Sequence, residues 1–208
     1  MVEEKIDRKT YNAGLIIEFT GSFEQAIIVA DEFRFSNGKK VLNYKIPGGM
    51  GKSPEGQEEW IFELSCLAKE FGFSEEEIGR ISSLERGRKN RLSQEKKGVI
   101  REVMEEVGLY VLELEHLHYQ LSPGNLSKGY PEADQNFFFV KKYAAPINPL
   151  PIFKSQDSDV KRIMKVYTEE LLDETPNSPA RTIVRTHRQA LVEKTKKFPG
   201  VYSKKVTL

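Results

Sequence analysis

The strongest constraint on this chain is a short central segment, residues 98–109, in which an apolar stripe and an acidic stripe share one predicted helix. The apolar stripe recurs at helical spacing and consists of Ile100, Val103 and Val107. The acidic stripe falls at positions i, i+3 and i+4, and so on a single face, and consists of Glu102, Glu105 and Glu106. We expect Ser93 to cap the start of this helix, and Gly108 to end it, because glycine accepts a left-handed backbone.

Three carboxylates on one helical face repel each other, at a cost of ~0.2–0.5 kcal/mol for each like-charged pair. A positive partner would make the arrangement favourable. Arg101 can pair with one carboxylate, and a hard divalent ion such as Mg²⁺, which takes oxygen ligands, could satisfy the others. The alternative is a solvated acidic face on a surface helix, which is a common feature.

The residues around this helix carry a family resemblance. Residues 101–109 read Arg-Glu-Val-Met-Glu-Glu-Val-Gly-Leu and match the second half of the Nudix box, R-E-U-x-E-E-x-G-U, where U is a bulky aliphatic residue. The first half is a glycine, five residues and a glutamate, which residues 49–55 supply after Ile46-Pro47-Gly48. The sequence therefore resembles the Nudix hydrolases. The family box places seven residues between its halves, whereas 45 residues separate Glu55 from Arg101 here.

The resemblance implies a metal site on the acidic face. Glu102, Glu105 and Glu106 would ligate Mg²⁺ or Mn²⁺, with the Gly49 carbonyl completing the set. Glu102 would be a further ligand or the base that orients water, and Arg101 would brace a box glutamate. The implied catalytic residues are therefore Glu102, Glu105 and Arg101.

The resemblance also implies a substrate site beside the glycine-rich turn at residues 47–51, here named the glycine bend. Gly48 and Gly49 would lie next to the pyrophosphate, where glycines allow close backbone approach. Glu55 matches the first-half glutamate, and Glu95, one turn ahead of the acidic face, is the alternative for that role. Arg88 belongs to a basic run, residues 86–91, that either contacts substrate phosphate or is a solvated linker.

The function implied by the resemblance is metal-dependent hydrolysis of the pyrophosphate linkage in a nucleoside diphosphate derivative. The partner would be a nucleotide-type small molecule, whose identity the box does not report because loops and insertions set specificity. The alternative is a catalytically inactive Nudix-like module that binds a nucleotide or a protein partner, the latter through Trp60 and Phe71 of the insertion. Nucleic-acid binding is disfavoured, because the basic residues are not interleaved with aromatic ones.

The expected fold is an α/β/α sandwich around a mixed β-sheet, in a single domain over residues 1–208. Helical periodicity and a capping-box pattern at Ser74 and Glu77 predict a helical hairpin within an insertion at 57–91, which we expect to act as a lid. The expected helices are 58–71, 74–86 and 182–196, with 160–172 either a helix or a strand and acidic turn. The expected strands are 13–20, 25–35, 40–46, 109–121 and 136–143, with an Asn37-Gly38 hairpin turn. The tail, residues 197–208, is expected to be loosely held.

Composition limits the environment and the partners. The net charge of +1 gives no overall attraction to nucleic acid or membrane, and no apolar run approaches ~18 residues. The charged N-terminus and the single cysteine favour a cytoplasmic location, and Cys66 is expected to be a small core residue. His116 and His118 should share one strand face, where solvent contact or hydrogen bonding is favoured over metal ligation. The oligomeric state stays open, a homodimer included.

Overall fold

The computed structural model describes residues 9–34, 40–88, 92–122, 132–147, 160–173 and 185–208. The helices are α1 Gln57–Glu70, α2 Glu75–Arg88, α3 Gln94–Val107, α4 Thr168–Leu172 and α5 Arg185–Lys197. The strands are β1 Lys9–Leu15, β2 Ile17–Thr20, β3 Phe23–Arg34, β4 Lys40–Lys45, β5 Gly48–Gly49, β6 Tyr110–Ser122, β7 Ala133–Ala144, β8 Val160–Tyr167 and β9 Lys204–Val206.

These strands form two sheets. The first is mixed and has the order β5-β1-β7-β6, with β9 beside β7. Strands β1 and β7 run parallel, whereas β6 and β7 run antiparallel. The second sheet is antiparallel, with the order β2-β3-β4 and with β8 against β3. The expected α/β architecture with a mixed sheet is confirmed, but the expected strand 13–20 is divided between the sheets, because β1 ends at Leu15 and β2 begins at Ile17.

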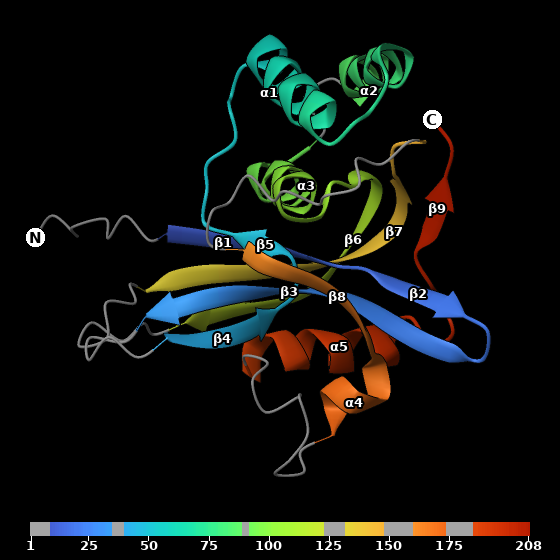
Figure 1. The fold of residues 1–208 in the computed structure, drawn as a ribbon. Coiled ribbons are helices and arrows are strands. Elements are labelled where there is room, and N and C mark those ends of the chain that lie inside the picture. The colour runs from blue at the N-terminus through green and yellow to red at the C-terminus, as the bar shows by residue number, and fades with distance from the viewer. Residues whose placement is uncertain (1–8, 35–39, 89–91, 123–131, 148–159, 174–184) are drawn as a thin grey trace, which may run out of the picture.

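Helices cover the sheets from both sides (Figure 1). Helix α3 lies against β1 so closely that a side chain at Gly14 would meet Val103 at 2.8 Å and Val99 at 2.9 Å. Helix α5 packs on the opposite side, where Ala190 and Leu191 join a core cluster with Ala13 and Leu15. Because Gly14 and Leu15 point to opposite faces of β1, one strand contributes to both layers.

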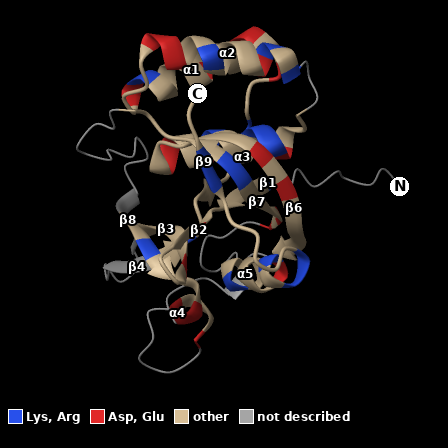
Figure 2. Ribbon diagram, turned by 90° about the vertical axis from the view of Figure 1, so that its right-hand side faces the viewer, with Lys and Arg blue, Asp and Glu red and all other residues tan. Residues whose placement is uncertain are grey.

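The insertion is a packed helical hairpin, which lies on the side of α3 that faces away from the sheets in both ribbon views (Figures 1 and 2). Helix α1 buries Trp60, Leu64 and Ala68 in the cluster that also contains Val103 of α3. The expected capping box is confirmed: the Ser74 amide donates to Glu77 Oε2 at 2.8 Å, and the Glu77 amide donates to Ser74 Oγ at 3.3 Å.

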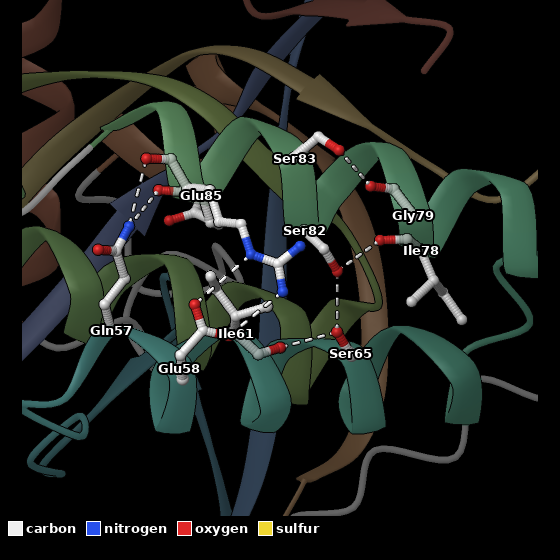
Figure 3. A network of polar contacts seen from close by, with 10 residues as sticks. Gln57, Glu58, Ile61, Ser65, Ile78, Gly79, Ser82, Ser83 and Glu85 are labelled. Atoms are coloured by element: carbon white, nitrogen blue, oxygen red, sulfur yellow. Dashed lines mark hydrogen bonds and ion pairs between the residues drawn. The ribbon is translucent and has the colours of Figure 1, made fainter.

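Polar contacts also join the two helices of the hairpin (Figure 3). The side chain of Gln57 donates to the backbone carbonyls of Glu85 and Arg86, both at 3.3 Å. The hydroxyls of Ser65 and Ser82 are 3.3 Å apart. The hairpin is thus held to α3 by apolar packing and held together by hydrogen bonds, so it has a fixed place in the fold.

Outside the site, the structure decides one alternative that the sequence left open and shows one expectation, the burial of Cys66, to be wrong. Residues 160–172 are mainly a strand, β8, followed by the short helix α4, as in the second of the two alternatives. These residues form a strand despite their helical spacing because they pair with β3, where Val166 lies opposite Ala26. Cys66 is exposed rather than buried, because the buried face of α1 is formed by Trp60, Leu64 and their neighbours.

The tail also differs from expectation, and so does the shared face of the two histidines, although His116 is exposed as expected. The tail is not loosely held, since β9 runs parallel to β7 and the buried Ser203 donates to the Val140 carbonyl at 2.5 Å. His116 and His118 are separated by a register irregularity in β6 and contact Phe138 and Phe137, respectively. The Asn37-Gly38 turn lies outside the described residues. Among the helices described, none combines the length and the apolar character required to span a membrane.

Candidate active site

Helix α3 has the ends that its sequence predicts. The Ser93 hydroxyl accepts from the Lys96 amide at 3.4 Å and caps the first turn. Gly108 ends the helix in the left-handed conformation, with φ 67°, and its amide donates to the Met104 carbonyl. A side chain at Gly108 would overlap the ring of Phe71, so the hairpin packs directly on this glycine. These contacts set where α3 begins and ends.

The glycine bend docks on α3. The Gly48 amide donates to Glu106 Oε2 at 2.7 Å, and Glu106 is fully buried. Lys45 Nζ lies 2.8 Å from Glu106 Oε1 and donates to the Gly48 carbonyl, also at 2.8 Å. The two halves of the box therefore meet, although 45 residues separate Glu55 from Arg101 in the sequence.

Two glycines of the bend leave room for side chains of α3. A side chain at Gly49 would overlap the carboxylate of Glu102, and one at Gly51 would overlap the guanidinium of Arg101. Glu102 is buried at the contact with the bend. The bend thus presents backbone, without intervening side chains, to the acidic face of the helix.

Arg101 forms ion pairs with two carboxylates of α3. Its Nη2 donates to Glu102 Oε1 at 2.6 Å, its Nε is 3.7 Å from Glu105 Oε1, and its Nη1 donates to the Lys52 carbonyl at 3.3 Å. Burial alone would lower the pKa of Arg101, but the charges of Glu102 and Glu105 outweigh it and raise the pKa above its ordinary value. Arg101 therefore stays charged and contacts both Glu102 and Glu105.

A further carboxylate comes from the insertion. Glu63 of α1 has its Oε1 3.9 Å from Arg101 Nη1. Burial raises the pKa of Glu63, while Arg101 opposes that rise and Glu102 adds to it. The sequence analysis did not identify Glu63. Helical periodicity shows which face of α1 is buried, but it does not show which residue of another helix lies next to Glu63. The packing of α1 on α3 supplies that information.

In the described part of the chain, the ion pairs of Arg101 are with Glu63, Glu102 and Glu105 rather than with Glu55 or Glu95. The Glu55 side chain is exposed, and its backbone carbonyl accepts from Lys97 Nζ at 3.5 Å. Glu95 lies in the first turn of α3 and is half-buried. Of the glutamates outside the second half of the box, Glu63 is the one that reaches Arg101 in the described part of the chain.

Arg88 takes part in a separate buried network. Its Nη1 pairs with Glu85 Oε1 at 2.6 Å, and its Nη2 donates to the backbone carbonyl of Leu112 on β6. Glu85 also accepts from Trp60 Nε1 at 2.9 Å and from the Tyr110 hydroxyl at 2.5 Å. Arg88 thus neutralises a buried carboxylate between α2 and β6, and the structure does not bring it to the acidic face of α3. Its neighbours Lys89 and Arg91 lie outside the described residues.

The donor set on α3 suits a magnesium ion with few protein ligands. Within the described ranges, no group of three or more His, Cys, Asp or Glu side chains is close enough to hold an ion. Mg²⁺ commonly takes one or two carboxylates and completes its shell with water and phosphate. Glu102 and Glu105 contact the same guanidinium, and Glu105 keeps 27% of its side chain exposed. They fit that role beside Gly49, whereas Glu106 is engaged by Lys45.

His187 of α5 anchors the strand that enters the bend. Its Nδ1 accepts from the Ile46 amide at 3.0 Å, and its ring contacts Phe137 and Tyr11 edge-on. Burial, with a contribution from the nearby charge of Lys45, lowers the pKa of His187 to about 3. The imidazole is therefore neutral at physiological pH, and its lone pair holds Ile46 in place.

This arrangement predicts a loss of stability in mild acid. The unfolded chain binds a proton at His187 near pH ~6.5, whereas the folded protein binds it only near pH 3, so the unfolded state holds more protons between these values. We expect the free energy of unfolding to fall as the pH falls through this window, by about 2 kcal/mol at pH ~5 from this group alone. Urea unfolding at pH ~7 and pH ~5 measures the difference.

The control for this prediction is a pair of histidine replacements. His187→Gln should reduce the difference between the two pH values, because the titrating group is gone, whereas His118→Gln on β6 should leave most of it in place. An equal loss of stability in wild type and His187→Gln would show that other groups cause the pH dependence.

Comparisons with known proteins show which solved structures this fold is similar to. No family model and no curated protein matches the sequence. Among solved structures, the chain is similar to a NUDIX hydrolase from Nitrosomonas europaea, with 13% identity, a TM-score of 0.53, and coverage of 94% of this chain and 93% of that chain. It is also similar to the NUDIX domain of Shewanella oneidensis NrtR complexed with ADP ribose, with 10% identity, a TM-score of 0.50, and coverage of 91% and 87%.

Proposed function

We propose, on the premise that this chain has the Nudix fold, that it hydrolyses the pyrophosphate linkage of a nucleoside diphosphate derivative with the help of Mg²⁺ or Mn²⁺. The observation that carries the proposal is the hydrogen bond from the Gly48 amide to Glu106 Oε2, 2.7 Å long. It joins the two halves of the box across the insertion, so the carboxylates and the glycine bend lie at one place.

Each group where the glycine bend meets α3 has a role in this proposal. A bound divalent ion would polarise phosphoryl oxygens and lower the pKa of a water molecule. Glu102 and Glu105 would hold that ion, and the Gly49 carbonyl would complete the set. In support, Gly49 lies so close to Glu102 that a side chain there would overlap its carboxylate. Arg101 would keep both carboxylates in position through its contacts of 2.6 Å and 3.7 Å. Glu102 would also orient the attacking water, as the family resemblance implies.

The substrate class follows from the bend and from one neighbour. Gly48 and Gly49 carry no side chains, so a pyrophosphate can approach their backbone closely. The NUDIX domain of the Shewanella protein was solved with ADP ribose, a nucleoside diphosphate linked to a sugar. We therefore place ADP-ribose first among the candidate substrates, ahead of nucleoside triphosphates, dinucleotide polyphosphates and coenzymes.

A substrate screen tests this function. Purified protein is incubated with ADP-ribose, nucleoside triphosphates and dinucleotide polyphosphates, with Mg²⁺, with Mn²⁺ and with a chelator. We expect one class to be split into two phosphate-bearing products only when a divalent ion is present. Water labelled with ¹⁸O should place one labelled oxygen on a product phosphate. A protein that cleaves no compound with either ion would contradict the proposal.

A nucleotide-binding module is the second candidate, and one observation favours it. Glu106 is engaged by Lys45 and by the Gly48 amide, and no three-carboxylate group suited to a metal is present among the described residues. Binding without cleavage separates the two functions. If calorimetry detects ADP-ribose binding that a chelator does not abolish, while the screen shows no products, the module is the better assignment.

A further inference from the structure

A lysine, Lys45, lies where the glycine bend contacts helix α3. Lys45 Nζ lies 2.8 Å from Glu106 Oε1 and 2.8 Å from the Gly48 carbonyl oxygen. The other carboxylate oxygen of Glu106 accepts from the Gly48 amide at 2.7 Å. The side chain of Lys45 is 15% exposed and that of Glu106 is 1% exposed. The ammonium, the carboxylate and the bend are therefore in mutual contact and almost shielded from water.

Among the described residues, two side chains bring positive charge to these carboxylates. Arg101 meets Glu102 and Glu105, and Lys45 meets Glu106. A buried carboxylate without a positive partner is strongly destabilising, so Glu106 requires either this ammonium or another cation. A divalent ion bound at Glu106 Oε1 would lie beside the ammonium of Lys45, which is 2.8 Å from that oxygen. Two cations so close together repel each other.

We propose that Lys45 is a built-in counter-ion of Glu106, which holds the glycine bend on α3 and competes with divalent metal for this carboxylate. The inference rests on the proposed function, because it concerns the metal that this function requires. It makes Lys45 a positioning residue that sets the metal affinity of the site. Metal ligation by Glu106 then requires the ammonium to leave, whereas ligation by Glu102 and Glu105 does not.

The test measures metal binding without substrate. Mn²⁺ is titrated into the full-length protein, and free Mn²⁺ is followed by electron paramagnetic resonance. Lys45→Met removes the competing charge while keeping an unbranched side chain, so we expect at least ~10-fold tighter Mn²⁺ binding than in wild type. Lys141→Met is the matched control, because Lys141 pairs with Glu113 and Glu115 on the surface, and it should leave the affinity within ~2-fold.

Thermal unfolding gives a second readout. Without metal, Lys45→Met should melt below wild type, because Glu106 has lost its counter-ion. Saturating Mn²⁺ should raise the melting temperature of this variant by more than it raises that of wild type, since binding to the folded state stabilises it. Lys45→Gln is the second variant, whose neutral amide can still donate to Glu106 and Gly48 and so preserve the fold.

The outcomes separate this inference from the proposed function. Unchanged or weaker Mn²⁺ binding in Lys45→Met and Lys45→Gln would overturn the competition, even if wild type hydrolyses ADP-ribose. Tighter binding in these variants would support the competition, even if the substrate screen finds no cleavage. If both variants stay unfolded at every Mn²⁺ concentration, metal cannot replace the ammonium, and the inference is also overturned.

Discussion

Glu105→Gln is expected to lower the metal-dependent kcat/KM of the protein by ~10²–10³-fold on the substrate that the screen identifies. The replacement keeps the shape of the side chain but removes the charge that a hard divalent ion requires. Glu105 is partly exposed and touches Arg101 only at 3.7 Å, so the fold should survive. Initial rates at several Mg²⁺ and Mn²⁺ concentrations would show whether added metal restores part of the activity.

The control for this variant is a surface glutamate. Glu76 of α2 pairs with Arg80 on the outer face of the hairpin, and both side chains are exposed. Glu76→Gln should therefore leave kcat/KM within ~2-fold of wild type. If Glu105→Gln retained wild-type rates and metal dependence, Glu105 would not be a ligand, and the carboxylates of α3 would serve only to hold Arg101.

Gly48→Ala is expected to reduce the free energy of unfolding by ~2–4 kcal/mol. The added Cβ would lie 2.5 Å from the Asn12 carbonyl oxygen and 2.6 Å from the Ala13 Cα. Both are backbone atoms of β1, so neither can rotate out of the way. The strand would have to move, and the hydrogen bond from the Gly48 amide to Glu106 would be lost or lengthened. Urea unfolding followed by tryptophan fluorescence measures the change.

The same substitution elsewhere provides the comparison. Gly79 lies inside α2, is exposed, and would place a Cβ in open space. Gly79→Ala should stabilise the protein by ~0.5–1 kcal/mol, because alanine favours the helix and has less freedom in the unfolded chain. A Gly48→Ala protein as stable as wild type would show that the bend is not pressed against β1.

Local sequence signals predicted the elements whose formation depends on neighbouring residues. Ser93 and Gly108 delimit α3 because capping and the left-handed turn act within a few residues. Ser74 and Glu77 form the capping box of α2 for the same reason. The spacing of Trp60, Leu64 and Ala68 fixed the buried face of α1.

Sequence patterns of short range were ambiguous or wrong for segments whose structure depends on contacts with distant parts of the chain. Residues 160–167 have apolar positions compatible with a helix, but β3 offers an edge with which they pair. The tail carries no strong strand pattern, yet β9 pairs with β7. Cys66 is small and has apolar neighbours in sequence, but the rotation of α1 turns it to solvent.

The sequence by itself determined the chemical character of the candidate site. Spacing along one helix places Glu102, Glu105 and Glu106 on a single face, with Arg101 beside them. In a helix, the number of residues between two positions sets the angle between their side chains. The pattern of two glycines before the insertion likewise identified the bend that meets this face.

Only the tertiary structure decided which charges meet at that face. Lys45 reaches Glu106 from β4, and Glu63 reaches Arg101 from α1, although neither residue belongs to the box. Arg88, by contrast, is drawn to Glu85 and away from the site. The physical reason is that an ion pair depends on distance and burial in space, and packing of segments that are far apart in the chain sets both.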